Sequence, residues 1–174
     1  MRKKILTSSA LTLLLGGCIA IDQRADQEVI DRAATANFTA RFANQAHYKS
    51  DADSPVVDNL ANLLLIPASQ SAVVQLAFSR DTGLRVDYPD VQQHRQIPLG
   101  EQLTINRAGA IELAAAKSCT AEKGVLGCDK KRLLLFINPQ GELVTIHTDM
   151  TAGVFIVLPY AHYRKNVAIF SRLQ

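Results

Sequence analysis

The chain has 174 residues, of which 48% are hydrophobic and 20% charged, and it has no tryptophan. These values fit one globular domain and exclude a disordered or collagen-like chain. The formal net charge of +3 is due to the basic residues at positions 2–4, and without them sixteen basic residues balance sixteen acidic ones, so a nucleic-acid-binding protein is not expected.

The first seventeen residues have the pattern of a secretory signal peptide. The basic residues at positions 2–4 precede a mostly apolar stretch from Ile5 to Leu15, and two glycines then lead to Cys18. The apolar stretch is shorter than the roughly 20 residues that an ordinary transmembrane helix needs. We therefore expect residues 1–17 to be removed from the mature protein.

The four residues Leu15-Gly16-Gly17-Cys18 resemble the lipobox of bacterial lipoproteins. The resemblance implies cleavage before Cys18, acylation of Cys18 and attachment to a membrane through its acyl chains. It covers residues 1–18 only. Because Ile19, and not Asp, follows the cysteine, the resemblance also implies the outer membrane, and we expect a domain that faces the periplasm. A conventional signal peptide with an incidental cysteine is the alternative.

Two cysteines remain if Cys18 is acylated, and they are Cys119 and Cys128. An even pair in an exported domain predicts a disulfide, which would close a loop of about ten residues and stabilise the fold by roughly 2–3 kcal/mol. No histidine lies near this pair, so a metal site is disfavoured. The absence of a Cys-x-x-Cys motif disfavours a redox role.

The chain after the signal peptide divides at about residue 55. Residues 18–55 are predicted to form a lipidated tether and an amphipathic helix, which would run from Asp26 to about Gln45. Four apolar residues recur there every four positions and would share one helix face: Ile30, Ala34, Phe38 and Phe42.

Residues 56–174 are predicted to form a β-rich globular domain. Residues 56–66 fit either a short helix or a buried strand. After them come about eight short apolar stretches separated by turn residues, which favour an antiparallel β-sandwich or a barrel-like domain. The predicted strands are residues 72–80, 84–88, 103–105, 111–115, 132–138, 142–148, 154–158 and 166–172.

Two patches are candidates for binding. The basic residues Lys130, Lys131 and Arg132 follow Cys128 and could meet lipid headgroups or another polyanion, or form a solvated hairpin end that protects the next strand from aggregation. The second patch, within a loop predicted over residues 160–165, combines aromatic and basic side chains that suit a protein interface: Tyr160, His162, Tyr163 and Arg164. A plain polar connection is the alternative for that loop.

The sequence has no motif for catalysis. It lacks a Gly-x-Ser-x-Gly motif and a glycine-rich phosphate loop, and its four histidines are not spaced for a metal. We therefore predict no cofactor, no metal and no enzymatic activity.

The expected function is a binding or assembly module of the bacterial cell envelope. It would be attached to the membrane through Cys18 and would bind an envelope protein, for example in secretion, pilus or envelope assembly. A lipid-anchored inhibitor or ligand-binding lipoprotein is one alternative. An envelope hydrolase with a site built from distant residues is another.

Overall fold

The computed structural model describes residues 18–21, 27–50, 59–64, 71–114, 117–122, 125–155 and 158–174. The predicted signal peptide, residues 1–17, lies outside the described residues. The mainly β architecture predicted from the sequence is confirmed, because the described residues form two sheets and only short helices.

The first sheet is built around three strands of thirteen residues each. In spatial order its strands are β1 (Cys18–Ile21), β12 (Leu158–Phe170), β11 (Leu143–Phe155), β10 (Val125–Ile137), β8 (Ile111–Ala114) and β7 (Leu103–Ile105). Two further strands, β3 (Tyr48–Lys49) and β9 (Ser118–Glu122), pair with β12 and β10. Neighbouring strands are antiparallel except for β1, which runs parallel to β12.

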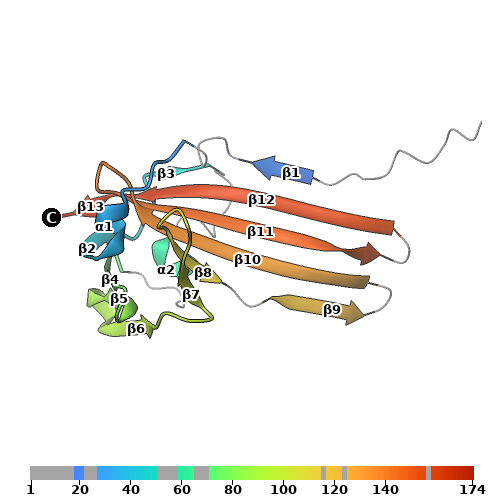
Figure 1. The fold of residues 1–174 in the computed structure, drawn as a ribbon, viewed down its shortest axis with the longest axis horizontal. Helices are drawn as coiled ribbons and strands as arrows, with labels where there is room; N and C mark the ends of the chain where they lie inside the picture. The colour runs from blue at the N-terminus through green and yellow to red at the C-terminus, as the bar shows by residue number, and fades with distance from the viewer. Residues whose placement is uncertain are drawn as a thin grey trace, which may run out of the picture.

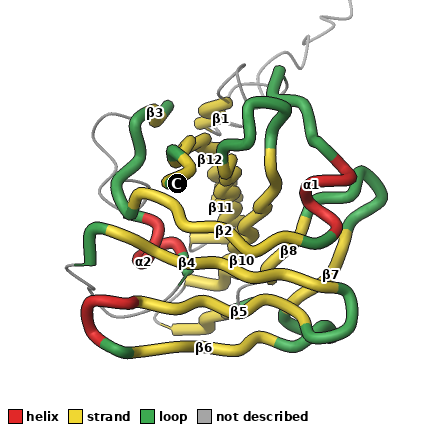
Figure 2. The backbone as a smooth tube through the Cα atoms, turned by 90° about the vertical axis from the view of Figure 1, so that its left-hand side faces the viewer, coloured by secondary structure: helices red, strands yellow, loops and turns green. Residues whose placement is uncertain are grey.

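The second sheet has five antiparallel strands. Their spatial order is β13 (Arg172–Leu173), β2 (Phe38–Ala43), β4 (Val73–Ser79), β5 (Gly83–Tyr88) and β6 (Gln93–Ile97). The helical elements are α1 (Arg32–Ala36), α2 (Leu60–Leu63) and the 3-10 turn η2 (Pro89–Val91). Figure 2 shows that the second sheet lies across the ends of β10, β11 and β12.

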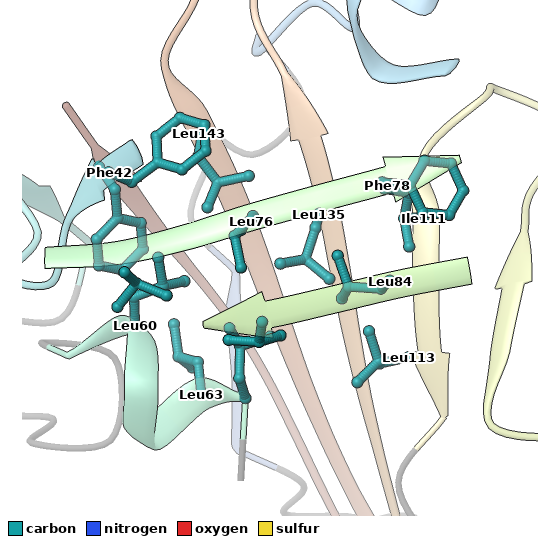
Figure 3. Close-up of a cluster of buried hydrophobic side chains, with 14 of the residues drawn as sticks. Phe42, Leu60, Leu63, Leu76, Phe78, Leu84, Ile111, Leu113, Leu135 and Leu143 are labelled. Atoms are coloured by element: carbon teal, nitrogen blue, oxygen red, sulfur yellow. The ribbon is translucent and has the colours of Figure 1, made fainter. Parts of the chain in front are cut away.

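The main hydrophobic core lies between the two sheets (Figure 3). Leu76 and Leu84 from the second sheet meet Leu135 and Ile111 from the first, and α2 adds Leu60. All five side chains are at most 1% exposed. Full burial of a side chain of this size stabilises a fold by roughly 1.5–3 kcal/mol.

A smaller core covers the opposite face of the same three long strands. Phe136, Val144 and Val167 are buried there and pack against the partly buried Ile30 and Tyr48 of the N-terminal segment. Both faces of this half of the strands are therefore covered. Together with the second sheet and the two cores, this half forms the part of the protein that we call the body.

The other half of the three long strands extends beyond the body (Figure 1). We call this part the arm. It consists of β9, residues 125–132 of β10, 148–155 of β11 and 158–165 of β12, with β1 along the outer edge of β12. No described side chain of the arm is fully buried. Within the described residues, the arm is thus a single layer of sheet with two uncovered faces.

The amphipathic helix predicted over residues 26–45 is wrong, although a short helix lies within that range. α1 has five residues, and its N-cap Asp31 accepts a hydrogen bond from the Ala34 amide at 2.9 Å. β2 then begins at Phe38. The four-residue spacing of Phe38 and Phe42 fits a strand too, because four is a multiple of the strand period. Pairing with β4 buries Phe42 in the main core, and this tertiary contact is the reason that the segment forms a strand and not a helix.

The loop predicted over residues 160–165 is also wrong, because these residues lie within β12. The strand predicted over residues 154–158 is divided between β11 and β12. Pro159 suggested a strand end, yet it is the second residue of β12, paired with Val154. β1 pairs with β12 only from His162 to Lys165, so Pro159 lies where no described strand pairs with this edge of β12. A proline is tolerated at such an edge because it has no amide hydrogen to donate.

Residues 56–66 were expected to form either a helix or a buried strand, and the described part of them contains α2. Its N-cap Asn59 accepts hydrogen bonds from the backbone amides of Ala61 and Asn62. The helix is four residues long, and its Leu60 and Leu63 close one end of the main core.

Candidate functional site: the exposed β-sheet arm

The two faces of the arm follow from the strand pairing. Paired residues of neighbouring strands lie on the same face, and successive residues alternate between faces. In the body, even-numbered residues of β10 face the smaller core, as Phe136 does, whereas odd-numbered residues such as Leu135 face the main core. The register of β10, β11 and β12 continues unbroken into the arm, so the same alternation holds there.

We name each face after one exposed side chain that lies on it, Met150 or Tyr160. The Met150 face continues the side of the smaller core and holds Cys119, Ala121, Leu126, Cys128, Lys130, Arg132, Thr148, Met150, Ala152, Val154, Pro159, Ala161, Tyr163 and Lys165. The Tyr160 face continues the side of the main core and holds Ser118, Thr120, Gly127, Asp129, Lys131, Asp149, Thr151, Gly153, Leu158, Tyr160, His162 and Arg164.

The Met150 face is apolar toward the end of the arm. Leu126, Met150 and Val154 are 61%, 44% and 38% exposed. Alanines and the two cysteines occupy the positions between them. Exposed apolar side chains that gather on one face usually mark a site of interaction, whereas isolated ones need no explanation.

On the Tyr160 face, the tyrosine ring lies across two glycines. Gly127, Gly153 and Tyr160 form one row of the sheet. A Cβ atom added at Gly127 or Gly153 would lie 2.5 Å or 2.7 Å from the Tyr160 hydroxyl oxygen. Glycine normally weakens a strand, and an aromatic side chain packed over it compensates for this loss. The ring is therefore held against the sheet while 37% of Tyr160 stays exposed.

Nearer the body, the Tyr160 face carries balanced charges. The Thr151 hydroxyl donates a hydrogen bond to Asp129 Oδ1 at 2.6 Å. The next row joins Lys131, Asp149 and Arg164, in which opposite charges lie on neighbouring strands. These contacts support a sheet on which no described element packs.

His147 lies where the Tyr160 face meets the main core, in the row after Asp149. Burial lowers the pKa of its imidazole from the usual 6.5 because the charged form loses solvation. The Asp149 carboxylate acts in the opposite direction, and Lys131 lowers the pKa further. The neutral imidazole is thus favoured at the base of the arm.

The cysteine pair predicted to form a disulfide stands at disulfide distance. Cys119 and Cys128 are direct partners of β9 and β10, with their Cα atoms 4.1 Å apart. The bridged segment is therefore a pair of strands at the outer edge of the arm, where the bridge fastens β9 to β10.

The predicted binding residues all lie in the arm, but each predicted patch is divided between the two faces. Tyr160, His162 and Arg164 share the Tyr160 face, whereas Tyr163 lies on the Met150 face. The basic residues divide in the same way, since Lys131 lies on the Tyr160 face and its neighbours Lys130 and Arg132 on the other. Arg132 Nε also lies 2.8 Å from Glu112 Oε1, which joins it to β8.

Cys18, the predicted lipidation site, is the first residue of β1 and pairs with His162 of β12. It therefore lies along the edge of the arm. The exposed apolar residues Leu126, Met150 and Val154 were missed by sequence reasoning. A usable signal was the alternation in β11, where even-numbered residues from Val144 to Val154 are mostly apolar.

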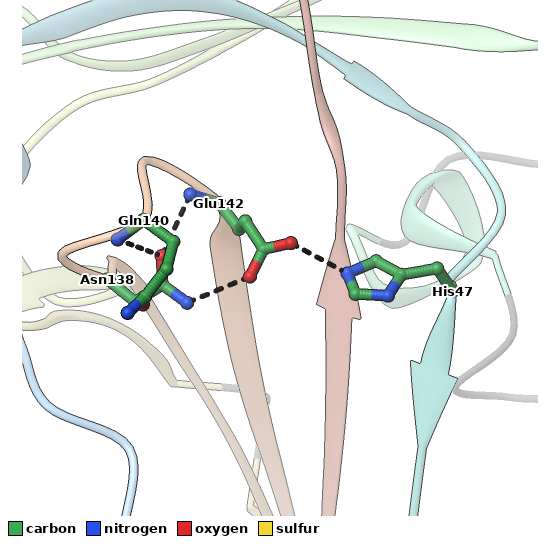
Figure 4. Close-up of polar contacts among 4 residues, drawn as sticks. All are labelled: His47, Asn138, Gln140 and Glu142. Carbon is green, nitrogen blue, oxygen red and sulfur yellow. Dashed lines mark hydrogen bonds and ion pairs between the residues drawn. The ribbon is translucent and has the colours of Figure 1, made fainter.

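A separate polar cluster lies at the body end of the β10–β11 hairpin (Figure 4). Asn138 Oδ1 accepts hydrogen bonds from the backbone amides of Gln140 at 3.1 Å and Glu142 at 2.9 Å. The Glu142 carboxylate accepts from Asn138 Nδ2 at 3.1 Å and lies 3.0 Å from His47 Nε2. These contacts shape the tight turn between the strands, so we assign the cluster a structural role.

Other kinds of site are not found in the described part of the chain. Within it, no group of three or more histidine, cysteine, aspartate and glutamate side chains could hold a metal ion. Among the same residues, no helix is long and apolar enough to cross a membrane. An open hollow of about 600 Å³ on the second sheet is lined by residues 39–41, Gln75 and residues 172–174, away from the arm.

None of the protein-family models, curated proteins or solved structures compared with this chain matches it. The function is therefore inferred from the arm and from the N-terminal sequence.

Proposed function

We propose that this protein is a lipid-anchored, non-enzymatic binding module of the bacterial cell envelope. It is attached to the outer membrane through acylated Cys18 and faces the periplasm, and its arm binds an envelope protein. The observation that supports this most is the single-layer arm. Sheets normally bury at least one face against another layer, so a sheet with two uncovered faces is expected to meet something outside its own fold.

The arm is suited to binding because it is ordered before a partner arrives. Its three central strands continue from the core without a break in pairing. The Cys119–Cys128 pair fastens its outermost strand, and Tyr160 packs over Gly127 and Gly153. A surface that is already rigid loses little conformational entropy on association, which favours affinity.

The Tyr160 face has the chemistry of a protein interface. It combines Tyr160, His162 and Arg164 with charges of both signs, such as Asp149 and Lys131. Tyrosine and arginine are the side chains that most often dominate binding energy in protein interfaces. A protein that presents charges of both signs around an aromatic or aliphatic side chain would be complementary to this face.

The test uses bacteria that produce the full chain with a photo-crosslinking amino acid in place of Thr120, an exposed residue of the Tyr160 face. We expect one crosslinked envelope protein, and we expect Tyr160→Ala to reduce its yield at least about tenfold, as for a dominant interface residue. Tyr163→Ala is the matched control, since it removes the same side chain from the other face of β12.

Two results would contradict the proposal. Equal crosslinking in wild type and Tyr160→Ala would remove the Tyr160 face from the interface. If Cys18→Ala migrates and fractionates with membranes like the wild type, the lipid anchor is wrong. Tyr160→Ala and Tyr163→Ala should both leave the main thermal unfolding transition of the body near that of the wild type, because neither residue belongs to the two cores.

A further inference from the structure

β9 is an edge strand whose outer side has no neighbour among the described residues. It pairs only with β10, over residues 118–122. The free side of an edge strand presents unpaired backbone N–H and C=O groups, which can pair with a strand of another chain. Proteins usually protect such an edge with a proline, with charged side chains or by keeping the strand very short.

The other strand edges of the described structure carry such protection. In the body, β13 has two residues, β7 has three, and β6 has an arginine at its centre. In the arm, Pro159 interrupts the edge of β12, and β1, which covers a further part of that edge, is short and begins at the proposed acylation site. β9 has five residues without a proline, and its only charged residue is the last one. Its edge is therefore open to strand addition.

The cysteine pair shows which backbone groups β9 presents at its free side. Opposite residues of antiparallel strands alternate between hydrogen-bonded pairs, with Cα atoms about 5.5 Å apart, and non-hydrogen-bonded pairs, about 4.5 Å apart. The Cα atoms of Cys119 and Cys128 are 4.1 Å apart, so this pair is of the second kind. The N–H and C=O groups of Cys119, and by alternation those of Ala121, therefore point away from β10.

These outward groups allow β9 to pair with β9 of a second copy. In an antiparallel pair centred on Thr120, Cys119 is opposite Ala121 of the second copy, and the two residues can exchange both backbone hydrogen bonds. This register pairs all five residues of β9. Within β9 it places no two charged residues opposite each other, because residue 122 is opposite Ser118. At the centre the two Thr120 residues are adjacent, and threonine pairs of this kind stabilise a sheet.

The body does not obstruct this pairing. Thr120 is opposite Gly127 of β10, and β8, the first strand of the body on that side, begins opposite Arg132. From Gly127 the strand rises about 17 Å to Arg132 but only about 7 Å to its end in the arm at Val125. In a two-fold pair, the arm of one copy would therefore end before the body of the other begins.

We propose that the free edge of β9 pairs antiparallel with β9 of a second copy, about a two-fold axis that passes by Thr120 and is perpendicular to the sheet. Such an axis does not exchange the two sides of a sheet, so the two Tyr160 faces form one continuous surface. A five-residue edge buries far less than the roughly 1,200 Å² of a stable interface, so the pair forms where copies are concentrated. This inference goes beyond the proposed function and does not depend on the identity of the envelope protein.

The first test uses bacteria that produce the full chain in two versions with different affinity tags. A photo-crosslinking amino acid replaces Thr120 in one version. We expect a product with the mass of two chains that carries both tags. The same amino acid in place of Ala161, an exposed residue of β12 at the opposite side of the arm, should give a several-fold lower yield. This product differs in mass and tags from a crosslink to the envelope protein, so the two proposals are measured separately.

The backbone pairing is tested with Ala121→Pro. Proline lacks the N–H group that Ala121 directs to the free side, and the pairing of β9 with β10 does not use this group. The double-tagged product should be lost in Ala121→Pro and kept in Ala121→Gly, which retains the N–H. In both variants the cysteine pair should stay closed to thiol reagents. Equal yields in the two variants, or equal yields from positions 120 and 161, would overturn the inference.

The register is tested by charges at the two-fold axis. Thr120→Lys in both versions places like charges directly opposite each other, as Thr120→Glu in both does, whereas one of each places opposite charges there. With the photo-crosslinking amino acid at the exposed Ser118, the double-tagged product should fall several-fold in both matched combinations and return in the mixed one. Thr120 is exposed and outside the cores, so the fold tolerates these changes. A mixed combination that yields no more than the matched ones would overturn the inference, whatever Ala121→Pro does to β9.

Discussion

At the scale of single residues, the contact between Tyr160 and its two glycines shows how an uncovered sheet supports itself. The two glycines differ in what surrounds them. A Cβ atom at Gly127 would meet the Tyr160 hydroxyl, at the end of a side chain that can move, whereas one at Gly153 would also meet the Gly127 Cα at 2.7 Å and the Leu126 carbonyl oxygen. The first clash can be relieved by a side chain and the second only by the backbone.

We therefore predict that Gly153→Ala loosens the arm more than Gly127→Ala does. Amide hydrogen exchange in residues 125–132 and 148–155 should be faster in Gly153→Ala, because the strands must separate to admit the methyl group. Adding Tyr160→Ala should restore normal exchange in Gly127→Ala but not in Gly153→Ala. The same exchange rates in both single variants would contradict this account.

His147 predicts a dependence of stability on pH. Since its pKa is lowered in the folded protein, the unfolded chain takes up the proton more readily. The contribution of the neutral imidazole is complete above the unfolded pKa of 6.5 and is lost as the pH falls below that value toward the folded pKa. Urea unfolding between about pH 7.5 and about pH 5.5 should show less loss of stability in His147→Gln than in wild type.

The control for this prediction is His94→Gln, which changes an exposed histidine of β6. It should leave the pH dependence of the wild type unchanged. If His147→Gln and His94→Gln behave alike, burial of His147 does not determine the pH response.

At the scale of elements, the strands near the core could be predicted from the sequence and the arm could not. Residues 133–137 of β10 form a continuous apolar run because both faces of the sheet are covered there, and such a run next to turn residues indicates a buried strand. In the arm, neither face is buried, so Lys130, Lys131 and Arg132 follow one another without any alternation of polarity.

The candidate site was predicted in part for the same reason. Residues 160–165 were singled out by composition and lie in the arm, but they were taken for a loop, so the opposite faces of Tyr160 and Tyr163 could not be foreseen. The cysteine pair was found because the argument counts the cysteines that remain after Cys18, and such a count does not depend on the fold. The pairing of β1 with β12 is a contact between residues more than 140 positions apart, which no local pattern indicates.

The disulfide predicts a local effect on the arm. Reduction, or replacement of Cys119 and Cys128 by serine, should speed amide exchange in β9, because the bridge is its strongest tie to β10. The global free energy of unfolding should fall by no more than the roughly 2–3 kcal/mol of loop entropy. Reductant should have no further effect on the double serine variant. Unchanged exchange in β9 would show that backbone pairing alone holds that strand.

At the scale of the whole molecule, the buried cores lie in the body, whereas the proposed binding surface lies in the arm. Leu135 is 1% exposed in the main core, whereas Leu126, on the same strand, is 61% exposed in the arm. Leu135→Ala should lower the free energy of unfolding by about 2–5 kcal/mol, the usual cost of a cavity in a core. Leu126→Ala should change it by no more than about 0.5 kcal/mol.

Chemical denaturation of the two variants under identical conditions checks this prediction. A large loss of stability in Leu126→Ala would mean that the arm packs on another part of the chain in solution. Comparable small losses in both would contradict the assignment of the main core.

The unbroken strands between the body and the arm have a mechanical consequence. β10, β11 and β12 each pass from one part to the other without a loop, so no hinge lies between them. Pulling along the strand direction would load many ladder hydrogen bonds together in shear, instead of opening them one after another. The arm then acts as a stiff lever whose far end moves only with the body, and a force applied there is transmitted directly to Leu135 and its neighbours in the core.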